Sequence, residues 1–172
     1  MKRTLILLAF LVFGLTSKTA LACSCGQSSV KDAYKNSDIV ISGQIISVTE
    51  EYFSDSASIK EMIGLPTDQL DKHKRVNGLY LKKVLIEVET VFKSQTTNDT
   101  LTIYTGAGGG DCGYRFKTGQ KYIIYGDQES YFGRVSKNKN FPSEQNIYWT
   151  NICTRTQEYN QAEISELEKI KK

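Results

Sequence analysis

Three residues near the start of the chain have the types and spacing for chemistry: Cys23-Ser24-Cys25. They follow a segment typical of a secretion signal, with an apolar stretch over residues 5–15 and small residues at Ala20 and Ala22. Cleavage after Ala22 would make Cys23 the first residue of the mature protein and free its amino group. Such a cysteine could be a lipid anchor, a disulfide partner or, through its amino group, a metal chelator.

The signal and the charge balance define the class of protein. Residues 1–22 are predicted to be a signal peptide, whose apolar stretch is too short to span a bilayer, and residues 23–172 to form one exported domain. Removing the signal takes away Lys2, Arg3 and Lys18 and no acidic residue, so 19 basic side chains would face 19 acidic ones. A neutral domain lacks the basic surface that nucleic-acid binding needs, and no nucleic-acid partner is expected.

All four cysteines, Cys23, Cys25, Cys112 and Cys153, lie in the part predicted to be exported. An even number of cysteines in an oxidising compartment predicts two disulfides. A bond between Cys23 and Cys25 would close a strained ring, because residues two apart in an extended chain do not have disulfide geometry. The two remaining connectivities both tie the N-terminus to distant parts of the chain.

The first half of the domain begins with a predicted helix. Ser28 or Ser29 could cap it, and its apolar spacing continues to about Asn36. A strand rich in Ile and Val is predicted over 38–48, with Gly43 at a bulge or bend. Residues 54–78 are more polar and are interpreted as an inserted excursion with a short helix around 59–63.

The second half alternates apolar and polar residues as strands do. Strands are predicted over 79–93, around 101–103 and over 122–125, with a hairpin partner over 131–135. A glycine-rich bend over 106–113 carries Cys112, and a terminal helix is predicted over 159–170. The resulting fold class is mainly β: a closed five-stranded OB-fold barrel with a short N-terminal helix and a C-terminal helix.

The chain resembles the netrin-like module, which forms the N-terminal domain of tissue inhibitors of metalloproteinases. The resemblance spans nearly all of residues 23–172 in the family's order. The matching residues are Cys23-Ser24-Cys25, the run from Ala33-Tyr34 to Gly43, Cys112-Gly113 followed by Phe116, Gly119 and Tyr122, and Cys153-Thr154-Arg155-Thr156. The chain departs from the family at Gly26-Gln27, where apolar and proline residues are usual, and its four cysteines leave no third disulfide.

The resemblance implies both a disulfide pairing and a function. It pairs Cys23 with Cys112 and Cys25 with Cys153. It also implies an inhibitor of zinc metalloproteases, in which the α-amino group and carbonyl of Cys23 chelate the zinc of the partner protease and the side chain of Ser24 enters its specificity pocket. The protein is then no enzyme, needs no cofactor, is monomeric, and acts in the periplasm or outside the cell.

Three alternatives remain open from the residues alone. Cys23 could serve only as a structural disulfide partner, since small exported domains use cysteines in this way. Lipidation of Cys23 would make the protein a membrane-anchored lipoprotein and leave an odd number of thiols. A non-enzymatic binding or envelope module could use a face of the barrel. A thiol-disulfide enzyme is disfavoured because the motif is Cys-x-Cys, and a histidine-based site because His73 is the sole histidine.

Overall fold

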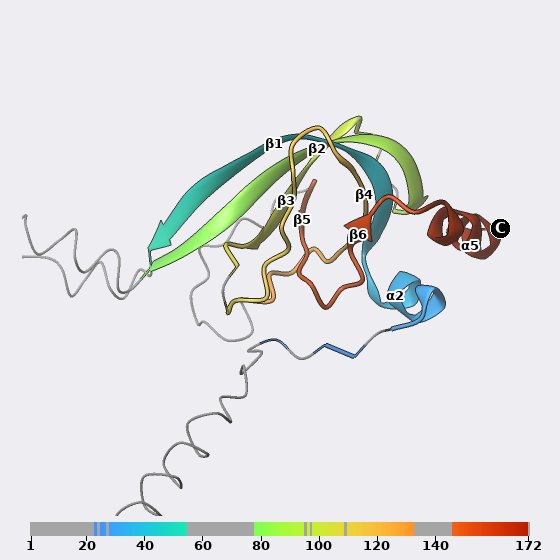
Figure 1. The fold of residues 1–172 in the computed structure, drawn as a ribbon, viewed down its shortest axis with the longest axis horizontal. Helices are drawn as coiled ribbons and strands as arrows, with labels where there is room; N and C mark the ends of the chain where they lie inside the picture. Colours follow the sequence, from blue (N-terminus) through green and yellow to red (C-terminus); the bar gives the residue numbers. More distant parts are fainter. Residues whose placement is uncertain are drawn as a thin grey trace, which may run out of the picture.

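The structure, a computed structural model, describes residues 23, 25, 26, 28–54, 78–94, 96, 98–108, 110–132 and 146–171 (Figure 1). The predicted signal peptide, the interior of the excursion over 54–78 and its short helix lie outside these residues. The described chain is mainly β with two helices. Its elements are α2 (Val30–Asn36), β1 (Ile39–Ser54), β2 (Gly78–Lys93), β3 (Thr100–Gly106), β4 (Lys121–Gly126), β5 (Ile147–Trp149), β6 (Gln157–Glu158) and α5 (Gln161–Lys171).

The strands form one mixed sheet of six, in the order β5-β3-β2-β1-β4-β6. All neighbours pair antiparallel except β3 and β5, which are parallel. The predicted closed barrel of five strands is not confirmed, because β5 and β6 are edges of an open sheet. One isolated pair, Asp127 with Trp149, links the chain after β4 to the end of β5 through two backbone hydrogen bonds.

Strand β1 bends at Gly43, as predicted, because the pairing with β2 shifts register between Ser42 and Gly43. The strand is longer than the prediction over 38–48 and runs on to Ser54. Residues 49–54, which the prediction did not include, contain Glu50 and Glu51 next to Tyr52 and Phe53. They pair with the start of β2, where Glu50 and Glu51 form ion pairs with lysines across the ladder.

Both faces of β4 and of the start of β1 are buried, which explains their short apolar runs over 122–125 and 39–41. Along β1, Ile39 and Ile41 lie in one apolar cluster, and Val40 between them lies in a second. The same alternation in β4 assigns Tyr122 and Ile124 to the first cluster and Ile123 and Tyr125 to the second. The second cluster includes residues of both helices, so α2 and α5 cover that face of the sheet, whereas none of the described residues of the first cluster belongs to a helix.

The two helices lie side by side against β1, β2 and β4 (Figure 1). The Ser29 hydroxyl caps α2 by accepting a hydrogen bond from the Asp32 amide. At the other end of α2, the Lys93 ammonium donates to the carbonyls of residues 34, 35 and 37, which lack helical donors. Helix α5 begins at Gln161, two residues later than predicted, because the Asn160 side chain accepts from the amide of residue 162.

The sequence did not indicate the two short edge strands, β5 and β6. In β5, Trp149 is almost fully buried and packs in a third apolar cluster with Tyr104 and Phe132. The predicted hairpin partner over 131–135 is wrong at its start, because Tyr131 and Phe132 form a turn. The rest of that segment lies outside the described residues.

The close approach at the bend makes Gly43 a test of the fold. A Cβ atom at Gly43 would lie 2.1 Å from the Glu87 carbonyl oxygen. Gly43→Ala is therefore expected to lower the free energy of unfolding by about 1–3 kcal/mol, measured by urea denaturation without reductant. Gly26→Ala is the matched control, because a Cβ atom there meets nothing within 4 Å. Equal midpoints for the two variants would contradict the close approach.

Candidate functional site: the cross-linked N-terminal segment

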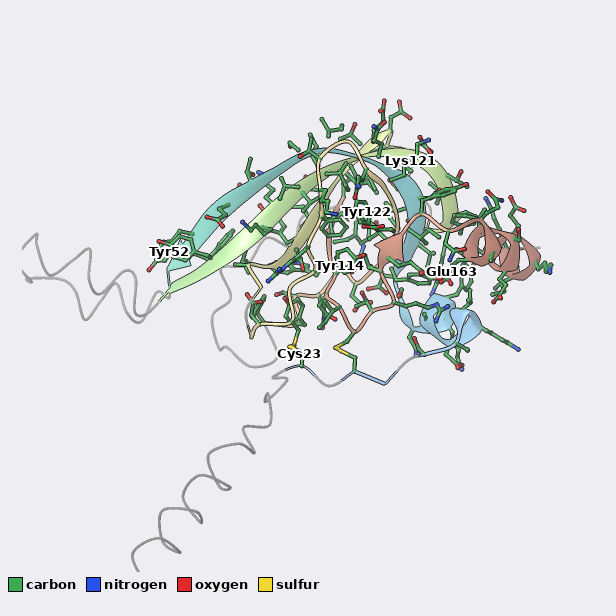
Figure 2. All side chains as sticks on the ribbon, viewed as in Figure 1. Cys23, Tyr52, Tyr114, Lys121, Tyr122 and Glu163 are labelled. Carbon is green, nitrogen blue, oxygen red and sulfur yellow. A yellow bond between two sulfur atoms is a disulfide. The ribbon has the colours of Figure 1, made fainter. Side chains whose placement is uncertain are left out.

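Two disulfides fasten the N-terminal segment to the body of the domain (Figure 2). Cys23 bonds Cys112, with Cα atoms 5.7 Å apart, and Cys25 bonds Cys153, with Cα atoms 5.1 Å apart. These are the two pairs that the resemblance implies. Ser24 stands between the two anchored residues but lies outside the described residues. The two bonds place Cys23 and Cys25 against two different loops.

The first anchor loop is organised around the carboxylate of Asp111. This carboxylate accepts hydrogen bonds from the amides of Ala107 at 2.7 Å, Gly108 at 2.9 Å and Gly113 at 3.1 Å. Cys112 takes a left-handed backbone with φ 59°. The sequence suggested only a flexible glycine-rich turn here. Asp111 instead gives the turn a defined shape, which fixes the position of Cys112.

Tyr131 adds a second support to the same loop. Its hydroxyl accepts from the Gly106 amide at 2.9 Å and donates to the Asp111 carbonyl at 3.2 Å. Burial raises the pKa of Tyr131 to about 12, so the hydroxyl stays protonated and able to donate. The chain also passes close to itself, since a Cβ atom at Gly113 would lie 2.1 Å from the Gly106 carbonyl oxygen.

The second anchor loop, residues 150–156, touches the first. The Ile152 amide donates to the Cys112 carbonyl at 3.0 Å, so the two loops that carry the disulfides are hydrogen bonded to each other. Within the second loop, the Asn151 side chain accepts from the Cys153 amide at 2.7 Å. Because the loops are joined, Cys23 and Cys25 are cross-linked to one connected support.

Threonine hydroxyls attach the second loop to the core at Tyr125 of β4. Thr150 donates its hydroxyl to the Tyr125 carbonyl at 2.9 Å, and the hydroxyl of Thr156 accepts from the Tyr125 amide at 3.0 Å. Thr150 and Thr156 are buried, and their hydroxyl oxygens are 2.6 Å apart. Buried polar groups that are paired in this way stabilise one loop conformation.

An ion pair between partly exposed Arg155 and buried Glu163 lies at the end of this loop. The guanidinium of Arg155 binds the Glu163 carboxylate of α5 through two hydrogen bonds, from Nε and Nη2, each 2.6 Å long. The Tyr125 hydroxyl donates to the same carboxylate at 2.6 Å. The remaining terminal nitrogen of Arg155 donates to the Ser28 carbonyl at 2.6 Å. One side chain therefore joins α5 to the N-terminal segment.

The surroundings of Glu163 favour its charged form. Burial by itself would raise the pKa of Glu163, but hydrogen bonds from Arg155 and Tyr125 outweigh it and lower the pKa below the ordinary 4.5. In turn, the hydrogen bond to Glu163 raises the pKa of Arg155. Burial and the neighbouring carboxylate raise the pKa of Tyr125, which remains a donor.

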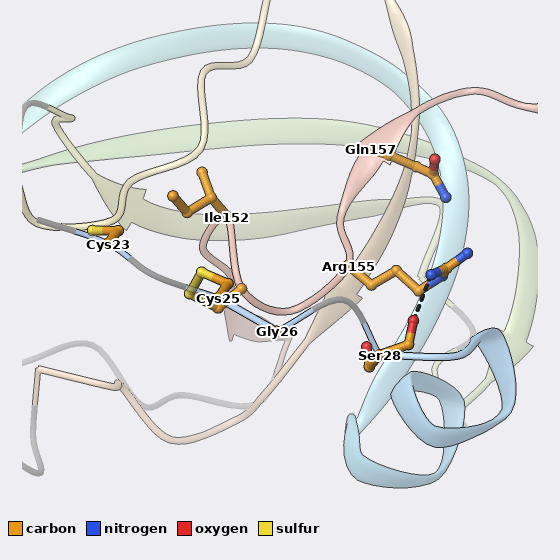
Figure 3. A pocket seen from close by; sticks show the side chains of 8 residues that line it. Cys23, Cys25, Gly26, Ser28, Ile152, Arg155 and Gln157 are labelled. Atoms are coloured by element: carbon orange, nitrogen blue, oxygen red, sulfur yellow. Dashed lines mark hydrogen bonds between the residues drawn. A yellow bond between two sulfur atoms is a disulfide. The ribbon is translucent and has the colours of Figure 1, made fainter. Parts of the chain in front are cut away.

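A cleft of about 500 Å³ opens beside the N-terminal segment (Figure 3). Its lining is mixed, with the exposed apolar side chain of Ile152 facing the polar groups of Arg155 and Gln157. The residues that line it are Cys23, Cys25, Gly26, Ser28, Ile152, Cys153, Arg155 and Gln157. The site is thus a cross-linked ridge with a hollow next to it, a shape suited to contact with another molecule.

The chemistry available at this site is limited. Both cysteine pairs are oxidised, so they offer no thiolate nucleophile. Among the described residues, no three His, Cys, Asp or Glu side chains gather in a group that could hold a metal ion. His73 lies outside the described residues. Within the described chain, no helix has the length and apolar character to cross a membrane.

Sequence reasoning found the cysteines of this site but not the groups that hold them. Asp111 was placed only in a turn, and Arg155 only in a motif that carries the resemblance. The prediction of the terminal helix rested on Ile164, Leu167 and Ile170, of which the first two are buried and Ile170 is half-buried. Glu163 gave no signal, because a glutamate in the first turn of a helix is common at exposed positions.

The comparisons with known proteins add no relative. No protein-family model matches this chain, and no curated protein matches it closely enough to show a relationship. Two disulfides are typical of proteins that fold in an oxidising compartment, which agrees with the expected export.

The buried ion pair predicts how stability depends on pH. The pKa of Glu163 is lower in the folded protein than in the unfolded chain, so its charge contributes stability above pH 4.5 that is lost as the pH falls through the folded pKa. Glu163→Gln is expected to cost about 1–2 kcal/mol at neutral pH, because Arg155 is partly exposed and solvent screens the charge left behind, and less as the pH falls below 4.5. Urea denaturation across this range measures the difference.

Glu166→Gln is the matched control for this prediction, because Glu166 is an exposed residue of the same helix. It is expected to change the unfolding midpoint little at any pH. A Glu163→Gln effect of the same size at neutral and acid pH would contradict the charged, paired state of Glu163.

Proposed function

We propose that this protein is an exported inhibitor of zinc metalloproteases of the netrin-like class. Its inhibitory group is the mature N-terminus, where the α-amino group and carbonyl of Cys23 bind the catalytic zinc of the protease. The side chain of Ser24 enters the specificity pocket, and Cys25 anchors the ridge.

The strand arrangement supports an OB-type barrel for this proposal. The order β5-β3-β2-β1-β4 and the parallel pairing of β3 with β5 suit a small barrel of five strands. The isolated pair of Asp127 with Trp149 brings the chain after β4 to β5, which are the two strands that would meet on closure. In this interpretation β6 is an addition at the rim.

The cross-linking of Cys23 and Cys25 to two joined loops is the observation that carries the proposal. Small exported domains also use several disulfides for stability alone, but here both bonds start within a span of three residues at the predicted mature N-terminus. Two such bonds hold the N-terminus in one orientation at the surface. A ligand that is already ordered loses less conformational entropy on binding, so the arrangement favours tight association.

The chemistry of zinc binding suits a free amino terminus. A catalytic zinc ion has three protein ligands and a replaceable water, and the nitrogen and oxygen of one terminal residue can take the place of that water. An α-amino group has a pKa of about 7.7–8.0, so part of it is neutral and able to coordinate at physiological pH.

The Cys23–Cys112 bond weighs against the lipid-anchored alternative. A lipid thioether would use the Sγ atom of Cys23, which is the atom that forms the disulfide. A lipid-anchored form would therefore leave Cys112 without its partner and Cys23 without its anchor. A Cys23 that carries no lipid can form the disulfide through its Sγ atom and still present a free amino group.

Moving the amino group tests the mechanism directly. One alanine inserted before Cys23 displaces the α-amino group by about 3.5 Å while both disulfides can still form. Loss of the zinc contact is expected to raise Ki by about 100-fold or more, equal to about 3 kcal/mol, against any protease that the wild-type protein inhibits. Inhibition of a panel of zinc endopeptidases by the secreted proteins provides the measurement.

The control for the insertion is an alanine added after Lys172, which changes the length and leaves the N-terminus unaltered. Both proteins should show the same unfolding midpoint as the wild type. Unchanged Ki in the N-terminal variant would exclude chelation by Cys23. A wild-type protein that inhibits no protease of the panel would favour the binding-module alternative.

The state of the N-terminus can be read from intact mass and N-terminal sequencing. The exported protein is expected to begin at unmodified Cys23, with no cysteine alkylated before reduction and four alkylated after it. A diacylglycerol or N-acyl mass on Cys23 would exclude the chelating mechanism, because acylation blocks the amino group.

A further inference from the structure

We propose that Arg155 is the positioning residue of the N-terminal segment and that Glu163 of α5 holds Arg155 for this role. The inference rests on the proposed function for its consequence, since the segment in question carries the inhibitory terminus. It assigns to α5 a role in setting the orientation of the ridge. The inference is based on the hydrogen bonds of one guanidinium, that of Arg155, which binds both Glu163 of α5 and the Ser28 carbonyl.

The segment needs such a support because Cys25 is its last residue with a disulfide to the body of the domain. The next fixed point along the chain is α2, which begins at Val30 and buries that residue. Between them, Gly26 is exposed, and even a Cβ atom there would meet nothing within 4 Å, so side-chain packing does not hold it. The bond from Arg155 to the Ser28 carbonyl fixes the stretch between these points (Figure 3).

Arg155 is itself held on two sides. Its backbone lies in the left-handed region with φ 75°, in a loop attached to β4 by buried threonine hydroxyls. Its side chain is fixed by the two hydrogen bonds to Glu163, whose side chain is only 5% exposed. The guanidinium therefore presents its remaining nitrogen to Ser28 with little freedom to move away.

Arginine is required by the geometry of the contact. The planar guanidinium donates from Nε and Nη2 to the Glu163 carboxylate and from Nη1 to the Ser28 carbonyl. The carboxylate and the carbonyl therefore contact different edges of the guanidinium group. A lysine ammonium is a single point of charge that can neutralise Glu163 but does not reproduce this three-bond arrangement. Arg155→Lys therefore separates charge pairing from positioning.

The test measures the segment in the free protein and the inhibition together. In Arg155→Lys, the backbone order parameters of Gly26 and Ser28 from nitrogen relaxation are expected to fall from about 0.85, typical of a rigid backbone, towards about 0.6, because the hydrogen bond that holds the Ser28 carbonyl is lost. Order parameters at the core amides of Ile41 and Ile123 should stay as in the wild type. Ki for a protease inhibited by the wild type should rise about tenfold.

A double variant guards against loss of folding from an unpaired buried charge. Arg155→Met with Glu163→Gln removes both charges of the ion pair and keeps an acceptor for the Tyr125 hydroxyl. It is expected to give the same fall in the order parameters of Gly26 and Ser28. Lys169→Met with Glu166→Gln, at exposed positions of α5, removes the same charges as a matched control and should change neither the order parameters nor Ki.

The outcomes separate this inference from the proposed function. Unchanged order parameters at Gly26 and Ser28 in both variants, or an equal fall at the core amides, would overturn the positioning role, whatever any protease does. Lower order parameters in the segment with unchanged Ki would overturn the link between Arg155 and inhibition. If the wild-type protein inhibits no protease, the proposed function fails, and the order parameters still decide whether Arg155 positions the segment.

Discussion

The rest of the site depends on one constraint: two disulfides leave the chain within three residues of each other and end on two different loops. Such cross-links position an N-terminus only if the loops that receive them are themselves fixed. The structure meets this requirement in two ways. Asp111 organises the loop of Cys112 with three backbone hydrogen bonds, and the Ile152 amide joins this loop to the one that carries Cys153.

The sheet supplies the rigid base for these loops through β4. This strand is buried on both faces, and Tyr125 lies at the point where the core meets the site. Its backbone holds the hydroxyls of Thr150 and Thr156, and its own hydroxyl binds Glu163. The loop of Cys153 and helix α5 are thus tied to the same residue. Because that residue is in the core, the orientation of the N-terminal segment is coupled to the fold as a whole.

The sequence predicts the parts of the fold that have a periodic or steric signature. The helix cap was predicted at Ser28 or Ser29 and lies at Ser29. The bend at Gly43 and the apolar run of β4 also follow from local chemistry, and both are confirmed. The edge strands β5 and β6 have three and two residues, too few for a pattern, and they form through pairing with distant strands. The roles of Asp111 and Glu163 likewise arise from tertiary contacts that no local pattern encodes.

The energetics of the ion pair between Arg155 and Glu163 argue for a role in orientation. Burying the Glu163 carboxylate costs free energy that its attraction to Arg155 only partly returns, so the pair adds less to stability than its short contacts suggest. An apolar pair, however, could not direct a donor at the Ser28 carbonyl. The pair gives α5 a directional bond to the N-terminal segment, and direction is what the proposed chelating terminus would need, because a zinc ion accepts ligands only at defined positions.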